Sequence, residues 1–180
     1  MDNLAKTHLP PERWKMNSGR AKHEGINFEL RDISAVKCQQ GIYVLIIKVS
    51  KSIRQVIGKM GEKEFAAGFY SYVGRARKGL GKRLSRHLSS QKQLHWHIDY
   101  LLQSPECQIV RIYIFSLTQN TECGINQRFL SLSEAQVICP GFGASDCRQA
   151  CGAHLVYLGI SPLSDSKLKK ICSDAVVAYG

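Results

Sequence analysis

One continuous apolar run, residues 41–48 (GIYVLIIK), constrains the fold of this chain more than any other segment. The run has the length of a strand, is rich in β-branched residues and does not alternate between apolar and polar side chains. That pattern is typical of a central strand buried on both faces. A second run, residues 68–74 (GFYSYVG), has similar character, and we expect it to pair with the first.

Further elements are expected around this strand pair, which makes the chain a mixed α/β domain. In residues 92–103 the leucines and isoleucines recur at helical spacing and predict an amphipathic helix. The same spacing in residues 168–176 predicts a closing helix. The other expected helices span residues 79–88 and 122–132, and the other expected strands span residues 54–57, 108–115, 135–139 and 154–158.

The length of 180 residues suffices for one globular domain with flanking segments. We interpret residues 1–35 as a basic N-terminal extension, residues 36–160 as the main domain, and residues 161–180 as a C-terminal helix packed on it. No apolar run approaches the ~20 residues that span a bilayer, and the N-terminus lacks the apolar core of a signal peptide. We therefore expect a cytoplasmic protein without a membrane partner.

Positive charge dominates the chain, with a formal net charge of +11, and favours an anionic partner such as nucleic acid. No acidic residue occurs between Glu64 and Asp99. Cations without neighbouring counter-charges suit a phosphate backbone better than internal ion pairs, although a solvated basic surface is the alternative. The expected nucleic-acid contacts in and around this window are Arg75, Arg77, Lys78, Lys82, Arg86 and Lys92.

The seven cysteines are an odd number, and without a signal peptide they argue against a disulfide framework. Four residues have the types found in structural zinc sites, namely Cys139, Cys147, Cys151 and His154. Their spacing is irregular and matches no standard zinc ribbon. Buried reduced thiols are the default interpretation of these cysteines, with a structural Zn²⁺ site as the alternative.

Several short segments together supply the groups that phosphodiester hydrolysis needs. A tyrosine or histidine can take the proton of an attacking water, an arginine matches the oxygens of a phosphate, and a carboxylate can hold a hard divalent cation. Each residue alone also has a structural interpretation, as a strand aromatic, a solvated helix charge or a helix N-terminal carboxylate. The residues of this constellation are Tyr43, Tyr72, Arg83, His87 and Glu122.

The motifs GIY at residues 41–43 and YVG at residues 72–74, followed by KRLSRH at residues 82–87, resemble the GIY-YIG nuclease superfamily. The stretches KQLHWHIDYLL at residues 92–102 and GFGASDC at residues 141–147 are similar to the Uri-type endonuclease group within it. Further similarity lies in FAAG at residues 65–68 and in Glu122-Cys123. The resemblance covers about residues 40–158.

The resemblance implies a metal-dependent DNA endonuclease that uses a single Mg²⁺ or Mn²⁺ ion. By analogy with the family, it also implies a role in DNA repair. In that scheme Tyr43 helps to activate the attacking water or lines the cleft, Tyr72 positions the phosphate, and Arg83 stabilises its charge. His87 acts as or orients the base, and Glu122 holds the metal. The implied fold is a small α+β sandwich on a three-stranded antiparallel or mixed sheet, with additional short C-terminal strands and a closing helix.

This chain departs from the family pattern beside the cleft. Arg75 stands where a small residue is expected after Gly74, and the late asparagine of some family members has only Asn126 as a weak counterpart. The residues expected to support the site are His95, Asp99, Ser145 and Asp146. Two other hypotheses therefore stand beside the nuclease: a catalytically inactive nucleic-acid-binding module, and a small zinc-stabilised protein with another role.

Overall fold

The computed structural model describes residues 39–91 and 93–180, and its centre is a five-stranded antiparallel sheet of order β6-β4-β1-β5-β7. The expected mixture of helices and antiparallel strands is confirmed, but the expectation of three strands in the central sheet is wrong, because two C-terminal strands extend its edges. The strands are β1 (Gly41–Val49), β4 (Gly68–Ala76), β5 (Cys107–Phe115), β6 (Leu155–Gly159) and β7 (Val177–Tyr179). The expected extension at residues 1–35 lies outside the described residues.

Strand β1 is buried on both faces, as its sequence predicts: every residue except Lys48 is buried. Successive side chains of a strand point to opposite faces, so this strand contributes to two separate cores. Tyr43, Leu45 and Ile47 belong to one core, and Ile42, Val44 and Ile46 to the other. Both faces of the sheet must therefore be covered.

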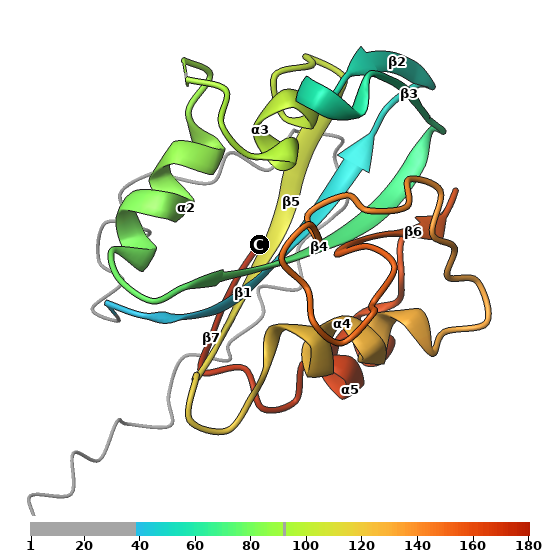
Figure 1. Ribbon diagram of the computed structural model, residues 1–180. Coiled ribbons are helices and arrows are strands. Elements are labelled where there is room, and N and C mark those ends of the chain that lie inside the picture. The colour runs from blue at the N-terminus through green and yellow to red at the C-terminus, as the bar shows by residue number, and fades with distance from the viewer. Residues whose placement is uncertain (1–38, 92) are drawn as a thin grey trace, which may run out of the picture.

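Helices cover the two faces in different places (Figure 1). Helices α2 (Leu80–Leu88) and α3 (His97–Leu101) pack on the face that holds Tyr43, while α4 (Glu122–Leu130) and α5 (Asp165–Ile171) pack on the opposite face. A small separate hairpin of β2 (Ile53–Val56) and β3 (Glu62–Phe65), joined through the short helix η1 (Gly58–Met60), lies beside α3. None of the helices in the described residues is long and apolar enough to cross a membrane.

The expected helix over residues 92–103 is much shorter than its periodicity predicts. Helix α3 begins only at His97, and the preceding Trp96 has an extended backbone. The cause is the buried Asp99 carboxylate, which accepts the backbone N–H groups of both His95 and Trp96. A side chain that takes these two donors defines a helix start, so the apolar periodicity upstream of His97 does not become helix.

The C-terminal segment also differs from the expected closing helix. Helix α5 ends at Ile171, although the helical spacing continues to Val176. The chain then turns and Val177, Ala178 and Tyr179 pair with β5. Strand β7 thereby provides hydrogen-bond partners for the backbone groups at the edge of β5. A longer surface helix would leave those backbone groups unpaired.

The position of α4 matters because this helix carries Glu122, and Phe129 anchors it in the second core with no exposed surface. We expect Phe129→Ala to lower the free energy of unfolding by about 3–5 kcal/mol, because the truncation leaves a cavity. Gln127→Ala, on the exposed side of the same helix, should change it by less than about 0.5 kcal/mol. Chemical denaturation measures both; equal losses would contradict this account of how α4 is held.

Candidate functional site

The two tyrosine motifs meet because their strands are direct neighbours. Tyr43 of β1 lies opposite Gly74 of β4, and Leu45 lies opposite Tyr72. The tyrosine rings lie on one face of the sheet with centroids 6.4 Å apart. A Cβ atom at Gly74 would overlap the hydroxyl end of Tyr43, so the phenol occupies the space that the missing side chain leaves. Burial raises the pKa of both phenols well above 10.

A buried chain of polar groups leads from Tyr43 into α2 and α3. The Tyr43 hydroxyl is 2.9 Å from His87 Nε2, and His87 Nδ1 is 3.7 Å from Asp99 Oδ1. All three residues are almost completely buried. Burial raises the pKa of Asp99, but His87, the N–H groups of Trp96 and His95, and Arg86 outweigh this effect and lower that pKa to about 2. Asp99 is therefore an ionised carboxylate behind His87.

The arginines of α2 are held in defined positions. Arg83 donates from Nη1 to the backbone oxygen of Arg75 at 2.8 Å, and its guanidinium lies 4.3 Å from the ring centre of Trp96. Arg86 lies at the same distance from that ring and pairs with Asp99 at 2.5 Å. Arg86, an expected nucleic-acid contact, is thus engaged in an internal ion pair. Arg83 remains beside the cleft.

A cleft of about 410 Å³ opens next to these groups. Its wall combines aromatic, cationic and acidic side chains from β4, α2, α4 and the loop before β6. Tyr43 itself does not line the cleft, but its hydroxyl end lies against Gly74, which does. The lining residues with chemical groups of interest are Tyr72, Arg75, Arg83, His95, His97, Glu122, Ser145 and Asp146.

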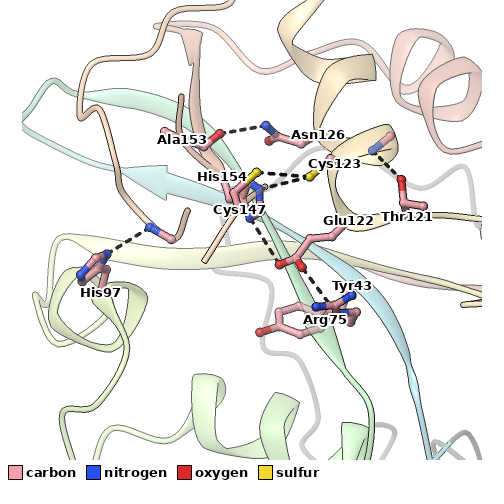
Figure 2. A network of polar contacts seen from close by, with 12 residues as sticks. Tyr43, Arg75, His97, Thr121, Glu122, Cys123, Asn126, Cys147, Ala153 and His154 are labelled. Carbon is pink, nitrogen blue, oxygen red and sulfur yellow. Dashed lines mark hydrogen bonds and ion pairs between the residues drawn. The ribbon is translucent and has the colours of Figure 1, made fainter. Parts of the chain in front are cut away.

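Glu122 lies at the start of α4, where Thr121 caps the helix by accepting the N–H of Gly124. Its carboxylate turns back toward the sheet rather than outward (Figure 2). Oε2 is 3.7 Å from Arg75 Nε, and Oε1 is 3.3 Å from His154 Nδ1. Glu122 also borders a second cleft of about 440 Å³, so its carboxylate stands in the wall between two cavities.

That second cleft is lined by Cys123, Cys147 and His154, which together with the buried Cys151 form a group that could bind a metal ion. The ligand atoms of Cys123, Cys147, Cys151 and His154 all lie within 4.8 Å of one another. The structure thus brings together three of the four residues singled out in the sequence, but not Cys139, which is buried in the first core, and Cys123 takes its place. Cys123 is not among the predicted zinc ligands, because its neighbour Glu122 is the ligand that the sequence predicts at this point of the chain.

Burial and polar contacts shift the pKa values of this group in different directions, and burial together with the neighbouring thiols raises the pKa of Cys123. Backbone N–H groups of Cys151 and Gln149 lower the pKa of the Cys147 thiol to about 6. Burial lowers the pKa of His154, but hydrogen bonds to Glu122 and the neighbouring thiols outweigh it and raise that pKa to about 9. A thiol that ionises near neutral pH is in the form that binds metals.

The remaining predicted residues differ in their position relative to the two clefts. Arg77, Lys78 and Lys82 are exposed near the end of β4 and the start of α2, and Arg77 lines the second cleft. Asn126 points away from the first cleft and donates to the backbone oxygen of Ala153. His95 contributes its backbone N–H to Asp99 instead of a side-chain pair. Lys92 lies outside the described residues.

Two cleft residues, Trp96 and His97, are not among the predicted site residues, although His97 belongs to the run His95-x-His97-x-Asp99, which has the residue types of metal ligands. Trp96 carries both arginines of α2, and His97 accepts the backbone N–H of Gly143 at 3.1 Å, which ties the loop before β6 to α3. Burial lowers the pKa of His97, consistent with a neutral ring that accepts a hydrogen bond. The sequence predicts a helix through this segment, whereas Trp96 has an extended backbone.

Comparisons with known proteins identify a domain family and nothing narrower. The profile of a family described as "Domain of unknown function DUF123" matches residues 42–177, three quarters of the chain, and spans both clefts. No curated protein matches the chain. No solved structure matches it either.

Because the Tyr43 phenol occupies the space above Gly74, we expect Gly74→Ala to destabilise the fold by about 1–3 kcal/mol through overpacking. Tyr43→Leu removes the ring carbons and the hydroxyl that the new Cβ would meet, so Gly74→Ala should cost less in that background. Thermal denaturation of the two single variants and the double variant measures the coupling. The same cost in both backgrounds would contradict the proposed contact.

The low pKa of Asp99 predicts a pH dependence of stability. A carboxyl with a folded-state pKa of about 2 and an ordinary value of 3.8 stabilises the fold above pH 4, and this contribution is lost as the pH falls toward 2. Asp99→Asn should therefore be less stable than the wild type at pH 7 and lose less stability between pH 4 and pH 2. Parallel stability curves for the two proteins over that range would count against an ionised, paired Asp99.

Proposed function

For this chain, which belongs to the DUF123 family, we propose the function of a metal-dependent nuclease of GIY-YIG type that hydrolyses phosphodiester bonds in DNA. The observation that carries the proposal is that a buried tyrosine–histidine–aspartate chain ends at Gly74, in the wall of a cleft that an oriented arginine and a carboxylate also line. These residues come from four elements and correspond to the groups that the reaction requires.

The proposed proton acceptor is the chain that begins at Tyr43. As the water attacks phosphorus, one of its protons passes to the Tyr43 oxygen while the phenolic proton passes to His87 Nε2, 2.9 Å away. Tyr43 is then neutral before and after the transfer, so its raised pKa does not oppose the step. Asp99 stabilises the imidazolium that forms on His87.

Arg83 is the proposed phosphate ligand. Its contact with the Arg75 backbone oxygen and its position against Trp96 fix the guanidinium at the cleft wall and reduce the conformational entropy lost on binding. A guanidinium can donate to two phosphate oxygens at once and is best placed to stabilise charge that develops in the transition state. Tyr72 lines the same cleft and can donate to a third oxygen.

The residues around Glu122 fit a hard divalent cation. Mg²⁺ and Mn²⁺ are held by one or two carboxylates together with substrate phosphate and water, and both Glu122 and Asp146 border the cleft. Such an ion, held by Glu122, would supply charge neutralisation at the phosphate and the leaving oxygen. The P–O bond to the 3′ oxygen breaks, that oxygen takes a proton from solvent, and the products are a 5′-phosphate and a 3′-hydroxyl.

The exposed cations next to the cleft suit the flanking DNA backbone. Arg77, Lys78 and Lys82 are exposed and lie between the end of β4 and the first turn of α2. Arg86 is paired with Asp99 and Arg75 with Glu122, whereas these three exposed cations can contact the flanking phosphates. Binding should therefore weaken steeply with rising salt concentration.

The test is a cleavage screen of the full-length protein on linear, nicked, branched and flapped DNA with Mg²⁺ or Mn²⁺. We expect cleavage that falls by about 10²–10³-fold in Arg83→Ala and in Glu122→Gln, because each loses transition-state stabilisation. Tyr43→Phe should lower kcat more than KM, since it interrupts proton transfer and leaves phosphate binding intact.

The exposed pair Arg54 and Glu64 on the β2–β3 hairpin supplies matched controls. Arg54→Ala and Glu64→Gln remove the same kinds of charge away from the cleft and should cleave like the wild type. Circular dichroism and denaturation check that each inactive variant is folded. Absence of cleavage of every DNA form with either metal, or full activity in Arg83→Ala, would overturn the proposal.

The ion pair between Arg75 and Glu122 favours a second candidate function. A guanidinium 3.7 Å from the carboxylate can take the place of a divalent cation, which would leave a nucleic-acid-binding module without catalysis. That module would bind DNA in a salt-sensitive way and show no metal-dependent turnover. Its Glu122→Gln variant would bind DNA with the same affinity as the wild type. Arg75→Ala separates the two: it should raise metal affinity in a nuclease and only weaken DNA binding in a binding module.

A further inference from the structure

We propose that Cys123, Cys147, Cys151 and His154 bind a structural zinc ion, and that this ion holds His154 so that its other ring nitrogen fixes the Glu122 carboxylate. The zinc site stands on its own geometry. Only its consequence for Glu122 rests on the proposed nuclease function.

The four side chains have the spacing of a tetrahedral site. Cys123 Sγ lies 3.4 Å from Cys147 Sγ and 3.9 Å from His154 Nε2, and all four ligand atoms lie within 4.8 Å of one another. Thiolates held at ~2.3 Å around tetrahedral zinc are about 3.8 Å apart, so an ion fits between them with small adjustments. All three thiols are free in this arrangement.

The four ligands come from separate parts of the fold, so the tertiary structure has to bring them together. Cys123 belongs to the first turn of α4, Cys147 and Cys151 to the loop before β6, and His154 directly precedes that strand. Figure 2 shows Cys123, Cys147 and His154 pointing at one another across this junction. Ala150, between the loop cysteines, has a φ of 51°, a left-handed conformation that non-glycine residues rarely adopt.

The surroundings match the charge of a zinc site with three thiolates. Three thiolates and one neutral imidazole around Zn²⁺ leave one net negative charge. The cleft that contains the group is also lined by Arg75, Arg77 and Arg148, which can balance that charge. Backbone N–H groups of Gln149 and Cys151 donate to the Cys147 sulfur, an arrangement that stabilises a thiolate.

His154 connects this group to the proposed active site. With Nε2 directed at the cysteines, Nδ1 lies 3.3 Å from Glu122 Oε1. A metal-bound histidine commonly donates its other N–H to a carboxylate, which fixes the ring tautomer and the carboxylate together. Zinc on Nε2 therefore makes Nδ1 the donor and orients Glu122, whose second oxygen faces Arg75 and the first cleft.

Metal analysis of the full-length protein, purified under reducing conditions, tests the zinc site. We expect one zinc per chain, and after exchange with Co²⁺ the visible bands of tetrahedral cobalt together with a thiolate charge-transfer band. Cys123→Ser and Cys147→Ser should lose the metal on dialysis. Cys107→Ser, at a partly exposed cysteine outside the group, should retain it.

Removal of zinc by a chelator should lower the melting temperature of the wild type but leave that of Cys147→Ser unchanged. These comparisons need no DNA and do not depend on whether every variant folds, because zinc and cobalt titrations of the wild type alone also decide the point. A wild-type protein that binds neither Zn²⁺ nor Co²⁺ under reducing conditions would overturn the zinc site.

Histidine side-chain NMR of the zinc-loaded protein tests the link to Glu122. The His154 ring should be protonated at Nδ1, and Glu122→Gln should retain zinc while shifting the Nδ1–H signal to higher field. An unchanged signal would overturn the link but not the zinc site. A protein that binds zinc and shows the signal shift, yet cleaves no DNA, would support this inference and contradict the proposed function instead.

Discussion

The structure depends on the burial of β1 on both faces. A strand without an exposed face cannot slip by one residue, because a slip would move every side chain into the opposite core. Its pairing with β4 is therefore fixed, and this register sets Tyr43 opposite Gly74. The position of the phenol next to the cleft follows from the same hydrophobic burial that stabilises the sheet, so stability and site geometry have one cause.

The opposite face of the sheet contributes the acidic half of the site. Helix α4 is held there by Ile125 and Phe129, and its first turn projects past the sheet so that Glu122 reaches the cleft side. Two separate cores thus position Tyr43, whose hydroxyl end lies against Gly74 beside the cleft, and Glu122, which lines the cleft. A loss of packing under α4 would move the carboxylate and leave the tyrosine–histidine–aspartate chain unchanged.

Local patterns in the sequence predicted those elements that local interactions determine. The runs that became β1 and β4 were recognisable because their apolar character is continuous along the chain, and helices α2 and α4 lie within the expected helical ranges 79–88 and 122–132. The start of α3 was not predictable from periodicity, because one buried carboxylate, Asp99, decides it by accepting two backbone N–H groups. The pairing of β7 depends on an open strand edge that only the assembled sheet presents.

The cysteine group shows the same limit in the site. Residue type suggested Cys139, yet Cys123 is the residue that the fold brings within 3.4 Å of Cys147, because α4 and the loop before β6 meet only after the sheet has formed.

Glu122 stands between two sets of ligands with opposite chemical preferences. Together with Asp146, Glu122 provides carboxylate oxygens, which suit a hard cation such as Mg²⁺. Beyond Glu122 lie the sulfur and imidazole ligands of the cysteine group, which suit Zn²⁺. In the proposed arrangement, ligand softness would let a hard and a soft cation occupy neighbouring sites without exchanging. His154 contacts both Cys123 and the Glu122 carboxylate, so in the proposed scheme the softer site would set the geometry of the harder one without taking part in its chemistry.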